Sequence, residues 1–241
     1  VMPGGRLVGQ CDQRAGPVQQ RRHRELAQVL RPQHQGLAAL ELTLLEQRGL
    51  QGQAIGFVGS SSIAEYIYST GCAHGKRVQC FGGAKNHMVV MPDADMDQAV
   101  DALISAGYGS AGERCMAISV AVPVGEKAAD ALMKKLVPRV ESLKVGTSLD
   151  PSADFGPLVT QAHLDKVKSY VDLGVKEGAT LKVDGRNFKL QGYEKGFYMG
   201  GCLFDNVTKD MRIYKEEIFG PVLSVVRAKD YNEGLALAND H

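Results

Sequence analysis

From residue 54 onward, apolar positions alternate between two patterns along the chain. Short β-branched or aromatic runs predict strands at 54–58, 77–81, 88–91, 118–124, 180–184, 200–206 and 222–226. Longer segments, with apolar residues three and four apart, predict helices at 63–72, 93–104, 126–143, 161–177 and from about 231 onward. Strands that alternate with helices indicate an α/β fold with mostly parallel sheets covered by helices.

The first predicted strand, Ala54–Val58, leads into its helix through Gly59-Ser60-Ser61-Ser62. We expect this strand to be buried, and Ser61 or Ser62 to cap the helix. A strand, a small-residue turn and a helix start can together offer backbone N–H groups to a phosphate. An ordinary helix cap explains the same residues, so this turn alone does not establish a phosphate site. Similarly, we assign Asp93 and Asp95 to helix capping and not to metal binding.

Residues 1–53 have a different composition from the rest of the chain. They contain no Phe, Tyr, Trp, Ile, Lys or Ser, and their seven Arg against four acidic residues give +3. Gly and Pro interrupt the first half, which predicts disorder, while residues 37–50 could form one amphipathic helix. A basic RNA-binding arm would need aromatic residues among the arginines, and there are none. Our leading hypothesis is an out-of-frame segment, which a peptide map of the natural protein would contradict if it contained residues 1–53.

Overall charge and cysteine usage exclude several classes of protein. The net charge is +1, so electrostatics favours neither nucleic acid nor membranes as partners. The five cysteines have scattered spacing, which argues against a disulfide framework and for a reducing compartment. No apolar run is long enough to cross a bilayer, and no signal-peptide pattern opens the chain. We expect a cytoplasmic location, or the mitochondrial matrix if the source is eukaryotic.

Candidate chemistry centres on the segment Ser110–Met116, which contains Cys115. A cysteine nucleophile reacts as a thiolate and must lie where a substrate can approach. The small residues at 109–112 let the backbone come close to a ligand. Most free cysteines are simply small buried hydrophobes, so the other motifs in the chain decide between the two interpretations.

Five motifs accompany this cysteine in a fixed order. They are Gly56-Phe57-Val58-Gly59-Ser60-Ser61, Phe81-Gly82-Gly83-Ala84-Lys85-Asn86-His87, Gly112-Glu113-Arg114-Cys115, Asp154-Phe155-Gly156-Pro157-Leu158 and Glu217-Ile218-Phe219-Gly220-Pro221. With these motifs, residues 54–241, about three quarters of the chain, resemble the aldehyde dehydrogenase superfamily. Within it they are similar to the CoA-acylating methylmalonate-semialdehyde dehydrogenases.

The resemblance implies a role for each matching residue. Cys115 matches the nucleophile, whose thiolate adds to the aldehyde carbon and becomes a thioester after hydride transfer to NAD. The Cys115 backbone N–H would help to stabilise the oxyanion. Gly59 and Ser60 match the turn beside the NAD pyrophosphate, Glu217 matches the carboxylate that binds the nicotinamide ribose, and Phe219 packs close by.

Cys80 is the informative departure from the superfamily pattern. Hydrolytic members carry a glutamate here, which activates water against the thioester, and a neutral thiol is a poor base for that task. The departure therefore favours acyl transfer to coenzyme A. In the resembled enzymes, methylmalonate semialdehyde gives propionyl-CoA with loss of CO2, and malonate semialdehyde gives acetyl-CoA. The alternative with the same chemistry is a hydrolytic enzyme that releases a free acid. A metal site made of Cys80, Cys72 and His74 would not follow zinc-site spacing.

Two further alternatives concern the chain as a whole. A cysteine hydrolase would need a histidine base, and neither His87 nor His163 sits in a motif that suggests one. A non-catalytic fragment of the dehydrogenase is the other. We expect this 241-residue chain itself to be catalytically weak or inactive, because the resembled enzymes have several hundred residues before the Gly59 turn and a further segment after His241. We expect residues 54–80 to end an incomplete NAD-binding domain and residues 81–241 to form a catalytic domain truncated at its C-terminus. Family members form homo-tetramers, which we regard as doubtful for this chain.

Overall fold

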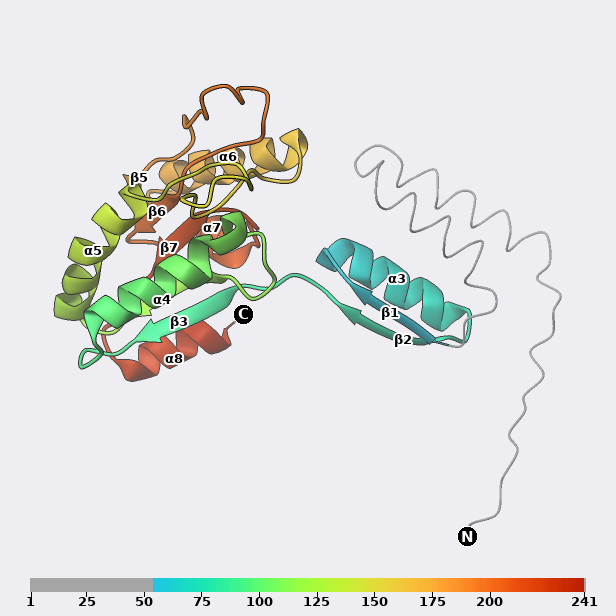
Figure 1. Ribbon diagram of the computed structural model, residues 1–241. Coiled ribbons are helices and arrows are strands. Elements are labelled where there is room, and N and C mark those ends of the chain that lie inside the picture. Colours follow the sequence, from blue (N-terminus) through green and yellow to red (C-terminus); the bar gives the residue numbers. More distant parts are fainter. Residues whose placement is uncertain (1–53, 241) are drawn as a thin grey trace, which may run out of the picture. The chain divides into compact units, whose positions relative to one another are not determined.

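The computed structural model describes residues 54–240 (Figure 1). The chain divides into two units, the first ending at Gly82 and the second beginning at Gly83. The disorder and the 37–50 helix expected for residues 1–53 lie outside the described residues. None of the helices among residues 54–240 is long and apolar enough to cross a membrane.

The described part of the first unit is a strand, a helix and a second strand. Strand β1 (Ala54–Val58) pairs in parallel with β2 (Arg77–Phe81), and α3 (Ser61–Ala73) connects them. Helix α3 packs tightly on the pair, since a Cβ built at Gly71 would lie 2.6 Å from Val78 Cγ2. At the carboxyl end of β1, Val58 is 67% exposed.

Two predictions for this unit are wrong. Strand β1 is not buried: its residues alternate between exposed and half-buried, because α3 covers only one face of the pair. The N-cap of α3 is Ser60, not Ser61 or Ser62, and no side chain caps the helix. Instead, the Ser60 carbonyl accepts the first helical hydrogen bonds, from the N–H groups of Ile63 and Ala64.

The second unit is built on a five-stranded sheet with the order β3-β4-β7-β6-β5. Neighbouring strands run in parallel except β5 and β6, which are antiparallel. This confirms the predicted α/β class with a mostly parallel sheet. The strands are β3 (Asn86–Val90), β4 (Ile118–Pro123), β5 (Thr180–Val183), β6 (Cys202–Asp205) and β7 (Val222–Val225).

Helices cover both faces of this sheet. Figure 1 shows α4 and α5 together on one side of β3 and α8 on the other side. The helices are α4 (Met96–Tyr108), α5 (Glu126–Glu141), α6 (Gln161–Lys176), α7 (Arg212–Lys215) and α8 (Tyr231–Asn239), with a 3-10 turn, η1, at Gly109–Gly112. The prediction did not include α7 or η1.

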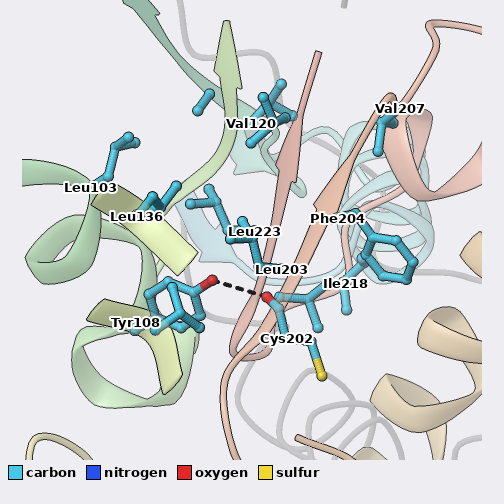
Figure 2. Close-up of a cluster of buried hydrophobic side chains, with 14 of the residues drawn as sticks. Leu103, Tyr108, Val120, Leu136, Cys202, Leu203, Phe204, Val207, Ile218 and Leu223 are labelled. Carbon is cyan, nitrogen blue, oxygen red and sulfur yellow. Dashed lines mark hydrogen bonds between the residues drawn. The ribbon is translucent and has the colours of Figure 1, made fainter. Parts of the chain in front are cut away.

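Helix α4 confirms the capping role of Asp95 and extends beyond its predicted end. The Asp95 carboxylate accepts hydrogen bonds from the N–H groups of Asp97 and Gln98. The helix continues past Ile104 to Tyr108 because its last turn is buried. The Tyr108 hydroxyl donates a 2.9 Å hydrogen bond to the Cys202 carbonyl (Figure 2).

Part of the hydrophobic core lies between α4, α5 and the central strands. Figure 2 shows Leu103 and Leu136 from the helices facing Val120 and Leu223 from the sheet. All four side chains are fully buried. This packing fixes the strands whose amino ends carry the site described below.

Candidate active site

The site lies where three loops enter the amino ends of parallel strands. One pocket is lined by three segments. They are the loop before β3 with the first residue of that strand (Ala84 to Asn86), the loop before β4 (Gly112 to Ala117) and the loop before β7 (Glu217 to Gly220). The sequence candidates Cys115, Glu217 and Phe219 all line it. Open α/β sheets usually bind ligands at the carboxyl ends of their strands, so this site uses the opposite end.

The loop that carries Cys115 is forced into an uncommon conformation. Ser110, Ala111 and Gly112 have φ values of 54°, 55° and 69°, in the left-handed region. A Cβ at Gly112 would lie 2.3 Å from the Gly220 carbonyl oxygen, so only glycine fits there. Ala111 is 1% exposed, which shows that packing holds the turn. The Cys115 side chain, three residues after Gly112, is exposed.

Arg114 anchors the same loop to the end of α4. Its guanidinium donates hydrogen bonds to the carbonyls of Ser105, at 2.7 Å, and Ala106, at 3.2 Å. A cation at a helix C-terminus also interacts favourably with the helix dipole. These bonds tie Arg114, the residue immediately before Cys115, to the end of α4.

Asn86 holds the other side of Cys115. Its Nδ2 donates to the Cys115 carbonyl at 2.8 Å and to the Ala117 carbonyl at 2.9 Å. Arg114 thus anchors the chain before Cys115 to α4, and Asn86 anchors the carbonyls of Cys115 and Ala117 to the start of β3.

Glu217 is fixed by the loop that precedes β3. Its Oε1 accepts a 3.2 Å hydrogen bond from the Ala84 N–H. Lys85 Nζ donates to the carbonyls of Ile213 and Glu216, both at 2.8 Å. Burial lowers the pKa of Lys85 to about 8, although Glu217 and Glu216 act in the opposite direction.

Phe219 completes the third loop. Its φ is 60°, and its side chain is 36% exposed. Its carbonyl lies 2.5 Å from His163 Nε2, and His163 also pairs with Glu113. From the sequence we considered His163 only as the base of a hydrolase. We did not predict its contact with Phe219 or its contact with Glu113.

Comparison with known proteins assigns the chain to a family. Residues 43–241 match the model of the aldehyde dehydrogenase family. The chain belongs to the aldehyde dehydrogenase family. The matched range begins at residue 43, inside the segment of unusual composition at 1–53.

Individual relatives agree with this placement. The chain is 60% identical over 189 residues to a malonate-semialdehyde dehydrogenase of Pseudomonas aeruginosa, covering 78% of this chain and 38% of the relative. A solved structure of a candidate methylmalonate-semialdehyde dehydrogenase of Sinorhizobium meliloti, complexed with NAD, shares 65% identity with a TM-score of 0.75, over 76% of this chain and 38% of that one. The chain therefore spans about two fifths of the length of these relatives.

More distant aldehyde dehydrogenases share the fold as well. A betaine aldehyde dehydrogenase of Staphylococcus aureus, in complex with NAD+, is 30% identical with a TM-score of 0.75, over 78% of this chain and 37% of that one. These neighbours confirm the aldehyde-dehydrogenase-like fold class predicted from the sequence.

The remaining candidates of this aldehyde dehydrogenase chain belong to the first unit. Gly59 and Ser60 form the turn between β1 and α3, where Ser60 is exposed. Cys80 lies on β2, opposite Phe57 of β1, and is half-buried. Among residues 54–240, no three His, Cys, Asp or Glu side chains are grouped as a metal site would need, so the structure brings together no ligand set around Cys72, His74 and Cys80.

Proposed function

We propose that this chain carries the catalytic cysteine of an NAD-dependent, CoA-acylating dehydrogenase for malonate or methylmalonate semialdehyde. The products would be acetyl-CoA or propionyl-CoA, with loss of CO2. The named relatives support the substrate class, since the chain is 60% identical to a malonate-semialdehyde dehydrogenase. The observation that carries the proposal is the exposed Cys115 thiol in the same pocket as Glu217 and Phe219.

The role of Cys115 follows from its accessibility. Its thiolate would form a bond to the aldehyde carbon, and the carbonyl oxygen would become an oxyanion. The backbone N–H of Cys115 would donate to that oxygen. Transfer of the hydride from the same carbon to NAD would leave a thioester on the sulfur. The carboxylate on the α-carbon of this acyl group would leave as CO2, and a proton would take its place. The CoA thiolate would then attack the thioester carbon and release the Cys115 thiolate.

We also propose NAD as the hydride acceptor, because the similar structure from Sinorhizobium meliloti is a complex with NAD. Glu217 uses Oε1 to accept from Ala84, and the carboxylate group lines the pocket, where it would accept from ribose hydroxyl groups. Gly59 and Ser60 open α3, and the N-terminus of that helix would receive the pyrophosphate. When bound, NAD supplies the acceptor for the substrate hydride.

Cys80 supports CoA as the acyl acceptor over water. At this position a thiol replaces the glutamate of the hydrolytic aldehyde dehydrogenases, so no carboxylate base is present there to activate water. The thioester on Cys115 would therefore persist until a stronger nucleophile arrives.

We also propose that residues 54–80 belong to an NAD-binding domain and residues 81–241 to a catalytic domain. The separation of the two units between Gly82 and Gly83 supports this division. The site candidates divide in the same way, with Gly59 and Ser60 before it and Cys115, Glu217 and Phe219 after it.

Absorbance of NADH tests the proposal. Purified chain would be mixed with NAD and malonate semialdehyde, and CoA would be added after a pause. The proposal requires a burst equal to the enzyme concentration, then steady turnover after CoA, and neither with Cys115→Ser. Steady turnover before CoA would support the hydrolytic alternative, and no burst would contradict the proposal for this chain.

A further inference from the structure

The segment Ala84–Asn86 contacts both of the loops that carry candidate catalytic groups. Toward the β7 side, the Ala84 N–H and the Lys85 ammonium bind the loop that contains Glu217. Toward the β4 side, the Asn86 carboxamide binds the loop that contains Cys115. Three consecutive residues thus connect two loops that lie about a hundred positions apart in the chain.

Asn86 extends the β3–β4 pairing to the cysteine. The backbone register of the two strands begins at Asn86 opposite Ile118, with an irregularity immediately after it. Before Ile118, the Asn86 side chain continues the hydrogen bonding between the two segments, since its Nδ2 donates to the carbonyls of Ala117 and Cys115. Met116, between them, is 84% exposed, so its own side chain does not hold this stretch by packing.

Lys85 fixes the peptide group that precedes Glu217. One acceptor of its ammonium is the Glu216 carbonyl, which belongs to the peptide bond between Glu216 and Glu217. The other acceptor is the Ile213 carbonyl in α7. The Glu216 side chain points to other partners, Tyr170 at 2.6 Å and Arg212 at 2.6 Å. Lys85 therefore acts on the backbone of this loop.

A buried ammonium is costly unless it is well paired, and this one lies among two carbonyls and the charges of Glu216 and Glu217. Such an arrangement holds its loop more firmly than a neutral side chain would, because hydrogen bonds from a charged donor are roughly twice as strong.

We propose that Lys85 and Asn86 are positioning residues, which together set the placement of Glu217 relative to Cys115. Asn86 fixes the chain on the carbonyl side of the thiol, and Lys85 fixes the peptide that carries the carboxylate. The catalytic consequence of this placement rests on the proposed function, whereas the placement itself does not.

Backbone hydrogen exchange of the whole chain tests the placement without requiring turnover. The reporters are two hydrogen-bonded N–H groups: that of Ala117, two residues after Cys115, and that of Glu216, immediately before Glu217. We expect Asn86→Ala to speed exchange at Ala117, and Lys85→Met to speed exchange at Glu216, each by about fivefold or more. Exposed Asn187→Ala and Lys127→Met serve as matched controls and should change neither reporter.

Alkylation of Cys115 gives a second readout with an internal reference. Cys72 is also exposed, so the ratio of the two alkylation rates reports on the Cys115 loop alone. Asn86→Leu is similar in size to asparagine, adds no charge and removes both donated hydrogen bonds. We expect it to change this ratio at least as much as Asn86→Ala does. A role in filling space alone would leave the Asn86→Leu ratio at the wild-type value.

Several outcomes would overturn the proposal. Unchanged exchange at both reporters in folded Asn86→Ala and Lys85→Met proteins would do so, as would an equal change in the control variants. If Asn86→Ala fails to fold, Asn86→Ser keeps one donor, and it must still speed exchange at Ala117. Faster exchange at the two reporters in the variants, together with no NADH burst from the wild-type chain, would support the positioning role and contradict only the proposed function.

Discussion

The Glu113 carboxylate lies 3.2 Å from the His163 imidazole, measured between Oε1 and Nε2. The same nitrogen lies 2.5 Å from the Phe219 carbonyl oxygen. His163, near the start of α6, therefore links the turn before Cys115 to the loop of Glu217 and Phe219. Glu113 and His163 are 9% and 20% exposed in their side chains, so this link is largely shielded from water.

The pKa of Glu113 makes this link sensitive to pH. Burial raises that pKa above the ordinary value of 4.5, while His163 and the Val159 N–H oppose the shift. The folded chain then keeps a proton that the unfolded chain releases, so stability falls as pH rises from 4.5 toward the raised value. Glu113→Gln removes this titration. We therefore expect the free energy of unfolding of the variant, relative to that of wild type, to increase as the pH rises through this window.

Urea denaturation at several pH values between about 4.5 and 7 would measure this gain. The control is Glu141→Gln, at an exposed position, and its difference from wild type in free energy of unfolding should be the same at every pH. A constant difference between Glu113→Gln and wild type over the whole window would contradict the prediction.

A second prediction concerns Gly112. Alanine there would place Cβ 2.3 Å from the Gly220 carbonyl oxygen in addition to straining a φ of 69°. Gly192 has a φ of 81° with open space around it, so Gly192→Ala isolates the backbone strain. We expect about 1 kcal/mol of destabilisation at Gly192 and more than about 2 kcal/mol at Gly112, measured by urea denaturation. Equal losses at the two sites would show that the Gly220 contact is not restrictive.

A third prediction concerns the buried ion pair of Asp205 and Arg227. Arg227 donates to both Asp205 oxygens, at 3.1 and 2.9 Å, and Asp205 is 2% exposed. Asp205→Ala leaves a largely buried guanidinium with only its outer partners, so we expect a loss of roughly 3 kcal/mol. The exposed pair of Arg139 and Asp101 is the control, and Asp101→Ala should cost less than about 1 kcal/mol.

The same pair should protect the chain against acid. Burial raises the pKa of Asp205, but hydrogen bonds from Arg227 and the Asn206 N–H outweigh it, and the net pKa lies below 3.8. The pair's stabilisation is therefore present above pH 3.8 and is lost as the pH falls through the lowered value. An Asp205→Ala variant whose deficit stayed the same at low pH would contradict this account.

A fourth prediction distinguishes the cysteines by their reactivity. Burial raises the pKa of the Cys202 thiol to about 11, so near pH 8 only about one thiol in a thousand is ionised there. Cys115 and Cys72 are exposed. Iodoacetamide followed by peptide mapping should modify Cys115 and Cys72 and spare Cys202 until denaturant is added. Modification of Cys202 at the rate of Cys72 would contradict the described core.

Local patterns predicted the fold well where they coincided with packing. Strand β2 has the predicted bounds, Arg77–Phe81, because its alternating pattern ends at the Gly82 turn. Elements that depend on distant contacts were missed. The turn η1 exists because Gly112 packs against Gly220. At the start of α7, the Arg212 N–H donates hydrogen bonds to the Glu177 carboxylate, thirty-five positions away.

The candidate site shows the same division. Motifs predicted Cys115, Glu217 and Phe219, and the pocket brings these three together. Their supports were not visible in sequence, because Asn86 lies 31 positions from Ala117, His163 lies 56 from Phe219, and Lys85 lies 131 from Glu216. No local pattern reports contacts at such separations.

The most direct test of the central claim is the mass of the chain after reaction with NAD and malonate semialdehyde in the absence of CoA. The account predicts an acyl adduct that maps to the Cys115 peptide, disappears when CoA is added, and is absent from Cys115→Ser. An unmodified Cys115 peptide, or an adduct that remains in the Cys115→Ser chain, would contradict it.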